Sequence, residues 1–577
     1  MVAILVVLVQ SSSLTTPQTS AVDVRAGIQA LIDGRDPALG ALTREERAEL
    51  DEWYHGRDSP VWLDASGRPD RNARDAVALL GSAADDGLDP ADYYQSLLGR
   101  LTSALQAQPS PRPAELACFD VAVSSGMLRY LRHLHAGRVD PRTIGFRFSV
   151  PADRHEFAVL LRAALADHRI IETAEGLQPS LGRYGELRAV LARYRALAAD
   201  PALEALPPAV RARPGDAYEG ADVLYRRLVA FGDLSAGVPA PPNSARYAGM
   251  LVDGVKRFQV RHGLEPDGVL GKSTLAALRT PIARRVRQIE LALERLRWLP
   301  HLGHERLIFL NIPMFRLWAW DAMPPSGVPS IGMDVIVGRA LNTQTPVFVE
   351  EMREVIFRPY WNVPPSILRH EVLPMIERDP DYLRREDMEI VRGPGDDARP
   401  VDATDQNLAA LRQRALRLRQ RPGPRNALGL IKFVFPNELN VYMHGTPAQA
   451  LFSRSRRDFS HGCVRVEDPV TLAEWALADQ REWGRDEILA ATTGSQSIRV
   501  KLTRPIQVVL FYTTAAVMPD DGTLRFAEDI YGHDARLDEA LAARARVVTA
   551  AGQSSTIGRS SWTMGRWRRS TSLWLEK

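Results

Sequence analysis

The chain contains 577 residues, which is enough for three or four domains of about 100 to 200 residues each. Apolar residues make up 45% of it and charged residues 25%, as is ordinary for a globular protein. The formal net charge of +3 is small for this length, so the composition suggests no nucleic-acid role.

The chain begins with an apolar stretch that is typical of part of a secretory signal. Residues 2–9 are an unbroken run of eight apolar residues, followed by polar and small residues up to Ala21. We expect residues 1–21 to be a signal segment that directs export, with cleavage after Ala21. The basic segment that normally precedes such a run is missing, so either the recorded start lies downstream of the true one or the signal is atypical. Because a bilayer span needs about twenty apolar residues, we expect contact with a membrane only through this segment.

Residues 22–203 have the pattern of a helical domain rich in alanine. Apolar residues recur at three- and four-residue spacing in runs such as 71–80 and 114–134. His133 and His135 could suggest a metal site, but two residues apart on a helix they point to different faces, so we expect none. We therefore predict a helical scaffold and assign no chemistry to it.

A small helical module follows between residues 204 and 281. Its first part, 204–245, is rich in proline and alanine and predicts loops. Leu251, Val255 and Phe258 then fall at helical spacing, and a second short helix follows a turn. The letters FQVRHGL and, after them, DGVLGKSTL resemble the peptidoglycan-binding type 1 module, a unit of three helices. The alternative is a helical spacer that only positions the next domain.

An amphipathic helix and a series of strands come next. Ile282, Val286 and Ile289 form one apolar stripe of a helix that we predict to link the two units over residues 282–304. The period of the apolar residues then becomes two, which predicts strands and a mostly β domain over residues 305–540. The first predicted strands are 307–312, 315–320, 333–337 and 354–357.

Between residues 364 and 426 the strand pattern stops. Residues 367–377 and 408–418 predict helices, and eight arginines but no lysines occur from Arg392 to Arg425. An insertion of this length inside a sheet domain is usually functional or disordered. We predict a helical lid whose guanidinium groups pair with substrate carboxylates. The alternative is a solvated pair of charged helices.

The residues with chemical potential gather in the stretch 441–466, which reads VYMHGTPAQALFSRSRRDFSHGCVRV. It contains Cys463, one of only two cysteines in the chain, with His444 nineteen positions upstream. Alternation places Tyr442 and His444 on one face of a strand, away from the core-facing residues. In the same way Cys463 and Arg465 share the face opposite the valines, so we expect the four side chains to lie together.

These residue types suit a thiol nucleophile and its base. A free thiol has a pKa of about 8.5, so His444 must take the proton of Cys463 before a thiolate can attack a carbonyl. The carbonyl of Gly445 is the local acceptor that fixes the tautomer of His444. We expect backbone N–H groups of His461, Gly462 and Cys463 to form an oxyanion hole. The alternative is a small buried cysteine and a histidine without a chemical role.

The second cysteine bears on this choice. Cys118 lies 345 positions before Cys463, inside an apolar helical run. A disulfide between the two would disable the nucleophile, and nothing in the sequence requires one.

The two motifs HGT at 444–446 and SHGCVRV at 460–466 together resemble the L,D-transpeptidase catalytic domain, the YkuD-type fold. Further motifs resemble the large multidomain, YcbB-like subclass: VGR at 337–339, TPV at 345–347, RPYWNVP at 358–364, RPGP at 421–424, LG at 428–429 and KFVFPN at 432–437. The resemblance implies that the insertion is a substrate-capping subdomain. We expect Arg465, Tyr442, Trp361 and Asn362 to contact the substrate.

With this resemblance the predicted fold class is α+β with several domains. A mostly β catalytic domain carries an inserted helical lid, and a helical scaffold and a three-helix peptidoglycan-binding module precede it. The expected boundaries are 1–21 for the signal segment, 22–203 for the scaffold, 204–281 for the module, 282–304 for the linking helix, 305–540 for the catalytic domain with its capping insertion at 364–426, and 541–577 for a disordered tail.

The resemblance also implies a function, which is cross-linking of peptidoglycan in the periplasm. Peptide stems serve as donor and acceptor, Cys463 forms a thioester, and the link joins two third-position diamino acids. No metal or organic cofactor is implied, and carbapenem-type β-lactams are the expected inhibitors. One alternative is an L,D-carboxypeptidase or another cysteine hydrolase, in which water replaces the acceptor amine. Another is a non-catalytic wall-binding protein that uses the module alone.

Overall fold

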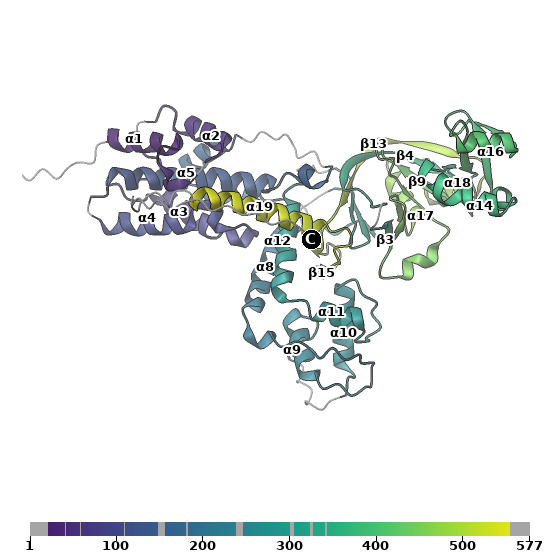
Figure 1. The fold of residues 1–577 in the computed structure, drawn as a ribbon, viewed down its shortest axis with the longest axis horizontal. Helices are drawn as coiled ribbons and strands as arrows, with labels where there is room; N and C mark the ends of the chain where they lie inside the picture. The colour runs from purple at the N-terminus through teal and green to yellow at the C-terminus, as the bar shows by residue number, and fades with distance from the viewer. Residues whose placement is uncertain are drawn as a thin grey trace, which may run out of the picture.

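The structure, a computed structural model, describes residues 21–40, 42–57, 59–108, 110–147, 156–179, 183–237, 246–299, 305–322, 327–340 and 343–553. Three arms meet near helix α12 (Ile282–Leu296): a long helical arm, a smaller helical arm and an arm built on a β-sheet (Figure 1). The expected signal segment lies outside the described residues, except for Ala21, where helix α1 begins. No helix within the described ranges is both long and apolar enough to cross a membrane.

The long arm is the predicted helical scaffold, packed around helix α5 (Pro113–Ala136). Helix α5 carries apolar and small residues on nearly all of its faces, and most of its residues are buried. At its centre the hydroxyl of Ser124 accepts hydrogen bonds from the indole N–H groups of Trp53 and Trp62, at 3.0 and 2.8 Å. The other helices of the arm are α1 (Ala21–Ile32), α2 (Arg44–Tyr54), α3 (Arg71–Gly81), α4 (Gln95–Ala107), α6 (Phe157–Ala166) and α7 (Ile170–Gly176).

The small arm is a unit of three helices, α9 (Ala221–Phe231), α10 (Met250–Arg261) and α11 (Lys272–Leu278). Gln259 is buried on α10, and its amide donates to Thr274 on α11 at 3.1 Å. Helix α8 (Tyr184–Ala198) packs along α12 where this arm joins the others.

The sequence prediction for this arm was wrong in one place. Helix α9 lies inside the proline-rich stretch 204–245 that we expected to form loops. Leu224, Leu228 and Phe231 on it are buried at helical spacing. Prolines lie on both sides of this short helix, so the composition of the stretch as a whole predicted loops.

The third arm is built on a closed sheet, and it corresponds to the mostly β domain that the sequence predicts. Its nine strands follow the order β11-β3-β12-β10-β9-β4-β13-β1-β2, and β2 also pairs with β3. Closure leaves only β11 at the outside and removes the open edges of the other strands. The strands are β1 (Leu307–Asn311), β2 (Arg316–Trp320), β3 (Ile331–Gly338), β4 (Phe348–Phe357), β9 (Ile431–Val434), β10 (Met443–His444), β11 (Asp458–Ser460), β12 (Val464–Val466) and β13 (Ile498–Phe511).

Helices and a hairpin complete this arm. Helix α17 (Pro469–Ala476) begins where the sequence predicts, with proline in its first turn and the Asp468 carboxylate accepting from the N–H of Thr471 at 3.0 Å. Helix α18 (Arg485–Thr493) and the hairpin of β14 (Ala515–Val517) and β15 (Leu524–Phe526) follow.

The insertion contains a sheet as well as helices. Its four strands follow the order β5-β8-β6-β7. The helix expected over 408–418 is wrong beyond Arg412, because residues 417–420 form strand β8 and pair with β5 and β6. Its elements are β5 (Trp361–Asn362), α13 (Pro365–Ile367), the π-helix η6 (Leu368–Val372), α14 (Leu373–Arg378), α15 (Tyr382–Arg385), β6 (Met388–Arg392), β7 (Arg399–Val401), α16 (Asp405–Arg412) and β8 (Arg417–Gln420).

The described chain ends in a long helix where the sequence predicted a disordered tail. Helix α19 (His533–Gln553) runs back along the scaffold (Figure 1). A buried ion pair at 2.5 Å joins Arg295 on α12 to Asp534 on α19, and Arg544 donates to the carbonyl of Arg138 at 2.6 Å. These tertiary contacts hold a helix whose own hydrophobic period is weak. Residues 554–577 of the expected tail lie outside the described residues.

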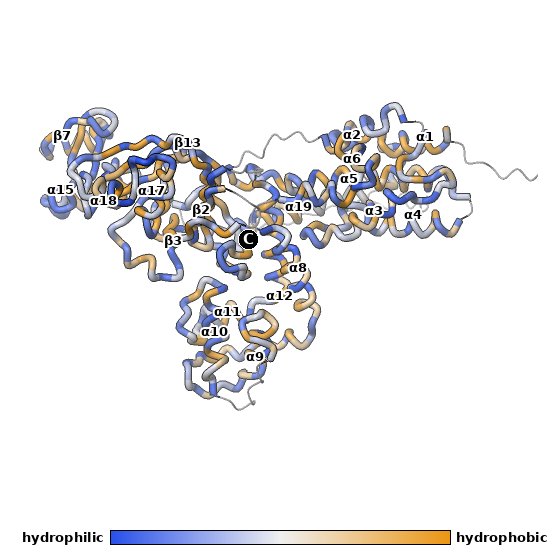
Figure 2. The backbone as a smooth tube through the Cα atoms, turned by 180° about the vertical axis from the view of Figure 1, so that it is seen from behind, coloured by the Kyte–Doolittle hydropathy of each residue, from blue (hydrophilic) through white to orange (hydrophobic). Residues whose placement is uncertain are grey.

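Buried side chains show how the arms are connected. Hydrophobic residues occur in all three arms (Figure 2), and the scaffold and the insertion each have a core of their own. The small arm, α12 and the closed sheet instead share one continuous core, which includes Leu251, Leu293 and Leu310. Close packing therefore fixes the position of the small arm against the sheet.

Candidate active site

Three neighbouring strands of the closed sheet bring the candidate residues together. β10 lies between β9 and β12, and the register places Lys432 and Arg465 directly beside His444, one on each side. Cys463 comes just before β12, and the same register places it beside Tyr442. Side chains two positions apart on a strand share a face, so all five residues lie on one face of the sheet. The valines of β12 and Met443 are buried on the other face.

His444 is held as a neutral imidazole. Although it lies on the site face, its side chain is only 4% exposed, so it is more deeply covered than the alternation alone suggests. Its Nδ1 lies 2.5 Å from the carbonyl oxygen of Gly445, the acceptor that the sequence indicated. Burial and then the charge of Arg465 lower the pKa of His444 to about 3, against the opposing effect of the carbonyls of Gly445 and Leu428. With Nδ1–H donating to Gly445, the lone pair of the neutral ring is on Nε2.

The thiol of Cys463 is half-buried beside several polar groups. Burial raises the pKa of Cys463, while hydrogen bonds from Tyr442 and the charges of Lys432 and Arg465 oppose that rise. Its Sγ lies 3.9 Å from the carbonyl oxygen of Asn440. No direct hydrogen bond joins Cys463 to the imidazole within the part of the chain that the structure describes. Catalytic hydrogen bonds are often long without substrate and tighten in the complex, so this geometry is compatible with a base and its nucleophile.

Lys432 belongs to the site, and sequence reasoning did not select it. Its Nζ lies 3.8 Å from the centroid of the Tyr442 ring, a cation–π contact. Burial lowers the pKa of Lys432, and the proximity of Cys463 opposes this effect. The chain has only five lysines, and Lys432 alternates with the buried residues Ile431 and Phe433. Rarity combined with alternation was the signal that could have identified it.

Arg465 has no acidic partner among the described residues, and its buried Nε lacks a hydrogen-bond acceptor there. Burial lowers the pKa of Arg465, and the like charge of Arg339 adds to this effect. An uncompensated guanidinium group on the site face is suited to bind a carboxylate.

The loop before Cys463 is held by a chain of hydrogen bonds. The hydroxyl of Ser460 accepts from the N–H of Gly462 at 3.1 Å and donates to the carbonyl of Cys463 at 2.5 Å. The hydroxyl of Thr345 donates to the carbonyl of Gly462 at 2.9 Å. Gly462 has a φ of 111°, which other residues rarely adopt. This loop can therefore hold the thiol in one position.

The oxyanion hole expected from the sequence must be corrected in one respect. The N–H of Gly462 is already donated to Ser460, so it is not free for a substrate. Within the described ranges the N–H groups of His461 and Cys463 have no acceptor. These two donors remain the candidates for the hole.

The insertion reaches this loop through a hydrogen bond between a histidine and a carboxylate. The Nε2 of His461 lies 2.6 Å from the Oε1 of Glu371, which is on the π-helix η6. Single π turns are frequent at functional sites. The side chain of His461 thus binds the insertion, a contact that sequence spacing could not reveal across 90 positions.

Trp361 and Asn362 are not brought to the thiol. Trp361 packs against the core of the insertion, and the amide oxygen of Asn362 accepts from Arg417 at 2.8 Å. Among the described residues neither side chain makes a polar contact with Cys463 or His444. Their expected role in binding substrate stays a prediction.

Most of the arginines of the insertion have partners inside it. Ion pairs or hydrogen bonds hold five of the eight: Arg412, Arg417, Arg419, Arg421 and Arg425. Arg392, Arg399 and Arg414 have no such side-chain partner within the described residues. The guanidinium groups free to meet a substrate are therefore fewer than the sequence suggested.

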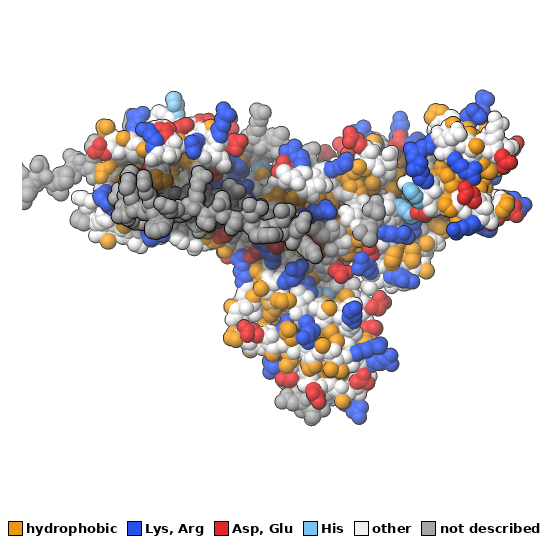
Figure 3. Space-filling view, viewed as in Figure 1, with side chains coloured by type: hydrophobic (Ala, Val, Ile, Leu, Met, Phe, Trp, Pro, Cys, Tyr) orange, Lys and Arg blue, Asp and Glu red, His pale blue; other side chains and the backbone are white. Residues whose placement is uncertain are grey.

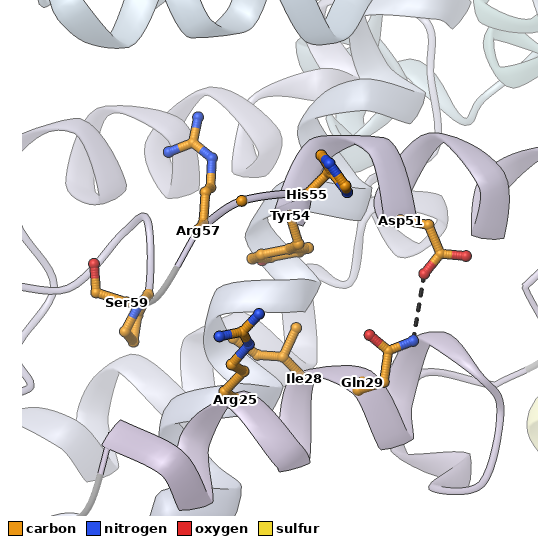
Figure 4. Close-up of a pocket in the computed structure, with 10 residues that line it drawn as sticks. Arg25, Ile28, Gln29, Asp51, Tyr54, His55, Arg57 and Ser59 are labelled. Atoms are coloured by element: carbon orange, nitrogen blue, oxygen red, sulfur yellow. Dashed lines mark hydrogen bonds between the residues drawn. The ribbon is translucent and has the colours of Figure 1, made fainter.

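Other parts of the molecule offer less chemistry. Nowhere in the described ranges do three or more His, Cys, Asp or Glu residues gather in a way that could hold a metal ion. His133 bonds instead to the hydroxyl of Tyr93 at 2.8 Å. A pocket of about 250 Å³ on the scaffold lies between α1 and α2, where Arg25, Tyr54 and Arg57 line it (Figure 4). It contains none of the candidate catalytic residues.

Three segments of the chain match families of known protein domains. Residues 48–191 match a scaffold domain, residues 221–278 a putative peptidoglycan binding domain, and residues 305–500 the L,D-transpeptidase catalytic domain. The three segments lie on the three arms of the fold, and the third contains both Cys463 and His444. None of these matches separates the large multidomain subclass from the rest of the family.

Two individual proteins can be compared with the chain. A putative L,D-transpeptidase of Haemophilus influenzae is 30% identical over 247 residues, which cover 42% of this chain and 47% of the relative. The chain thus spans about half the length of that curated relative. The crystal structure of an L,D-transpeptidase from Xylanimonas cellulosilytica is 15% identical and covers 53% of this chain and 100% of its own, with a TM-score of 0.16, too low to carry any argument.

Proposed function

We propose that this chain, which carries an L,D-transpeptidase catalytic domain at residues 305–500, is an exported enzyme that cross-links the peptide stems of peptidoglycan in the periplasm. One observation carries the proposal most directly. A half-buried thiol, Cys463, and a neutral imidazole, His444, share a sheet face with the two cations Lys432 and Arg465. The peptidoglycan-binding module on the small arm supports the same substrate class.

The first half of the reaction forms an acyl-enzyme. His444 accepts the thiol proton, and the sulfur of Cys463 attacks the carbonyl carbon between the third stem residue and the terminal D-alanine. The N–H groups of His461 and Cys463 stabilise the oxyanion, where one such donor is typically worth about 3 kcal/mol. The C–N bond breaks, D-alanine leaves with the proton from His444, and a thioester remains.

The second half transfers the acyl group. The side-chain amine of a third-position diamino acid on another stem attacks the thioester carbonyl. His444 accepts the amine proton, a new amide bond forms, and the sulfur leaves and is reprotonated. If water attacks instead of the amine, the product is a shortened stem and the enzyme is an L,D-carboxypeptidase.

Charge at the site makes the proton transfer depend on substrate. With a pKa of about 3, His444 is a weak base in the empty site, largely because it is buried and faces Arg465. A substrate carboxylate paired with Arg465 neutralises part of that charge and makes the imidazolium easier to form. The thiol of the empty site is therefore mostly protonated, and binding of a stem favours its deprotonation.

The experiment is product analysis by mass spectrometry. The purified protein is incubated with disaccharide-tetrapeptides, with Cys463→Ala as the matched control. We expect the wild-type protein to form cross-linked dimers and to release D-alanine. Neither product should appear with Cys463→Ala. Tripeptides alone show hydrolysis, and no turnover combined with retention on peptidoglycan shows a binding protein.

Two further measurements test the assigned roles. His444→Ala should nearly abolish acylation, because the thiol loses its base; unchanged acylation assigns that role to another group. A carbapenem-type β-lactam, which resembles the acyl donors of this family, should add to Cys463 in the full-length protein and not to Cys463→Ala.

A further inference from the structure

A groove of about 910 Å³ lies between the small arm and the closed sheet. One wall comes from α10, α11 and the turn between them, and α12 forms its floor. The opposite wall comes from the turn between β1 and β2, residues 452–457 and residues 525–530. Because the two walls share one continuous core, the groove is a fixed feature of the fold.

The sheet-side wall is directly connected to the nucleophile. Residues 452–457 join the segment after His444 to strand β11, which leads into His461, Gly462 and Cys463. Arg457 anchors this wall, since its guanidinium donates to the carbonyls of Arg454 and Phe315 at 2.6 and 3.2 Å. A ligand in the groove therefore contacts the same stretch of chain that carries the thiol.

Several charged side chains of the groove neutralise one another. Asp334 pairs with both Arg316 and Arg457, Arg456 pairs with Asp458 and Glu528, and Arg525 pairs with Asp521. These pairs build the walls and leave little charge for a ligand.

Apart from Arg285, which donates to Gln288 and lies over the Phe526 ring, three cations of the groove have no acidic partner among the described residues, and each comes from a different element. Lys272 begins α11, Arg284 lies on α12, and Arg454 lies on the sheet-side wall. Two acidic residues of the lining, Glu265 and Asp529, have no cationic partner among the described residues. The carboxylate of Asp529 accepts a hydrogen bond from the hydroxyl of Tyr512 at 2.6 Å. Figure 3 shows blue Lys and Arg side chains on both sides of the notch between the small arm and the sheet arm.

The rest of the lining is polar and suits a polymer rich in hydroxyl groups. Ser273, Thr280 and Ser455 line the groove and can form hydrogen bonds with such a ligand. The rings of Phe315 and Phe526 are buried beneath the guanidinium groups of Arg457 and Arg285, so they support the walls and leave the groove surface polar. Free cations then select a polymer that carries carboxylates.

We propose that this groove binds a peptidoglycan strand, with Lys272, Arg284 and Arg454 pairing with carboxylates of its peptide stems, and so holds the polymer beside the loop that carries Cys463. The inference rests on the proposed function for its ligand class. The groove does not include Cys463 or His444, so it acts on intact polymer and has no part in the chemistry.

The test compares polymer with a short substrate in the full-length protein. The variant combines Lys272→Glu, Arg284→Glu and Arg454→Glu. Arg211→Glu and Arg481→Glu are matched controls, because both residues are exposed, lie outside the groove and have no side-chain partner within the described residues. The readouts are co-sedimentation with purified peptidoglycan sacculi and the ratio of cross-linking in sacculi to cross-linking of soluble disaccharide-tetrapeptides.

We expect the triple variant to bind sacculi at least about tenfold more weakly and the cross-linking ratio to fall by a similar factor, with both controls like wild type. Wild-type retention should weaken as salt rises, because the contacts are ionic, and replacing Arg454 by lysine should restore most of the binding lost with glutamate. Amidation of the sacculus carboxylates should lower wild-type retention to the level of the triple variant.

Three results would overturn the proposal: unchanged retention of the triple variant, an equal fall in activity on polymer and short substrate, or equal retention on amidated sacculi. The proposed function can fail separately. If the wild-type chain binds sacculi through these cations but produces neither dimers nor tripeptides, the groove stands and the enzymatic assignment does not.

Discussion

A single substitution can test whether the guanidinium group of Arg465 binds the substrate. Its guanidinium lies beside His444 on the site face without an acidic partner among the described residues. Arg465→Lys keeps the charge and loses the planar fork, and contacts of this kind are worth about 1.5 to 3 kcal/mol. We expect the initial rate of cross-linking of disaccharide-tetrapeptides to fall about ten- to hundredfold. A wild-type rate would leave Arg465 with a structural role only; Arg481→Lys, an exposed position, is the control.

Lys432 supports the thiolate through charge. Its ammonium group opposes the rise that burial gives to the pKa of Cys463. Lys432→Met should shift the pH profile of iodoacetamide alkylation at Cys463 to higher pH and slow the reaction at neutral pH roughly three- to tenfold. Mass spectrometry of the alkylated protein measures this.

Two variants separate charge from packing at Lys432. Lys432→Arg keeps a cation and should restore most of the reactivity, whereas Lys501→Met, at an exposed position on β13, should leave the profile as in wild type. A Lys432→Met profile identical to that of wild type contradicts the electrostatic role.

At the scale of one element, strand β3 sets the position of the nucleophile loop. A Cβ on Gly338 would lie 1.9 Å from the carbonyl oxygen of Thr343 and 2.7 Å from the N of Thr345, both backbone atoms. Thr345 in turn holds the carbonyl of Gly462. Gly338→Ala should therefore lower the thermal midpoint and reduce cross-linking more than about tenfold, since overpacking costs about 1 to 3 kcal/mol and moves the loop.

The matched control for this substitution is Gly423→Ala, where a Cβ meets nothing within 4 Å. We expect that variant to resemble wild type in both assays. If Gly338→Ala also keeps full activity, the loop does not depend on the end of β3.

The insertion acts as one element over the site, in our prediction. Replacing residues 364–425 by a short Gly-Ser linker should keep alkylation of Cys463, because the thiol and His444 lie downstream of it. Asn426 is retained because its buried amide donates to the carbonyl of Pro359 at 3.1 Å. Cross-linking of peptide stems should drop steeply, since a flexible stem must be ordered at an entropic cost that lid contacts offset.

A point substitution refines this experiment. Glu371→Gln replaces the carboxylate that binds His461 by an amide, and it should lower cross-linking less than the deletion does. If the folded deletion variant cross-links as well as wild type, the insertion is no lid. If it loses alkylation by iodoacetamide as well, the insertion supports the fold of the site.

At the scale of the whole molecule, buried histidines tie stability to pH. Burial lowers the pKa of His444 and of His533 to about 3, and that of His133 well below its usual value. When the chain unfolds, each returns to about 6.5 and takes up a proton below that pH. The unfolded state thus binds more protons, and stability falls as pH decreases from about 6.5, by up to about 1.4 kcal/mol per pH unit for each histidine.

Thermal midpoints between pH 8 and pH 5 measure this dependence. Asp120, whose pKa burial raises to about 6, opposes one histidine in the same window. His533→Phe should flatten the profile, because the ring packs against Phe146 and Tyr512 and its Nδ1 has no partner among the described residues. Midpoints that do not change with pH, or the same slope in His533→Phe, contradict the prediction.

The sequence by itself determined the parts that depend on local spacing. Period two located the strands from Leu307 onward, helical spacing located α10 and α12, and the cap at Asp468 located the start of α17. The motif at 460–466 and HGT at 444–446 were enough to select Cys463 and His444. These signals are local because a strand repeats every two residues and a helix every three or four.

Only the tertiary structure decided what pairs across distance. The register of β9 with β10 placed Lys432 beside His444, the fold of the insertion brought Glu371 to His461, and pairing with α12 held α19 as a helix where composition predicted disorder. The strand at 417–420 also exists through its partners β5 and β6. Strand register and ion pairs between distant elements depend on contacts that the local spacing of residues does not specify. The reason is that a short segment with a given strand or helix propensity can pair with more than one partner.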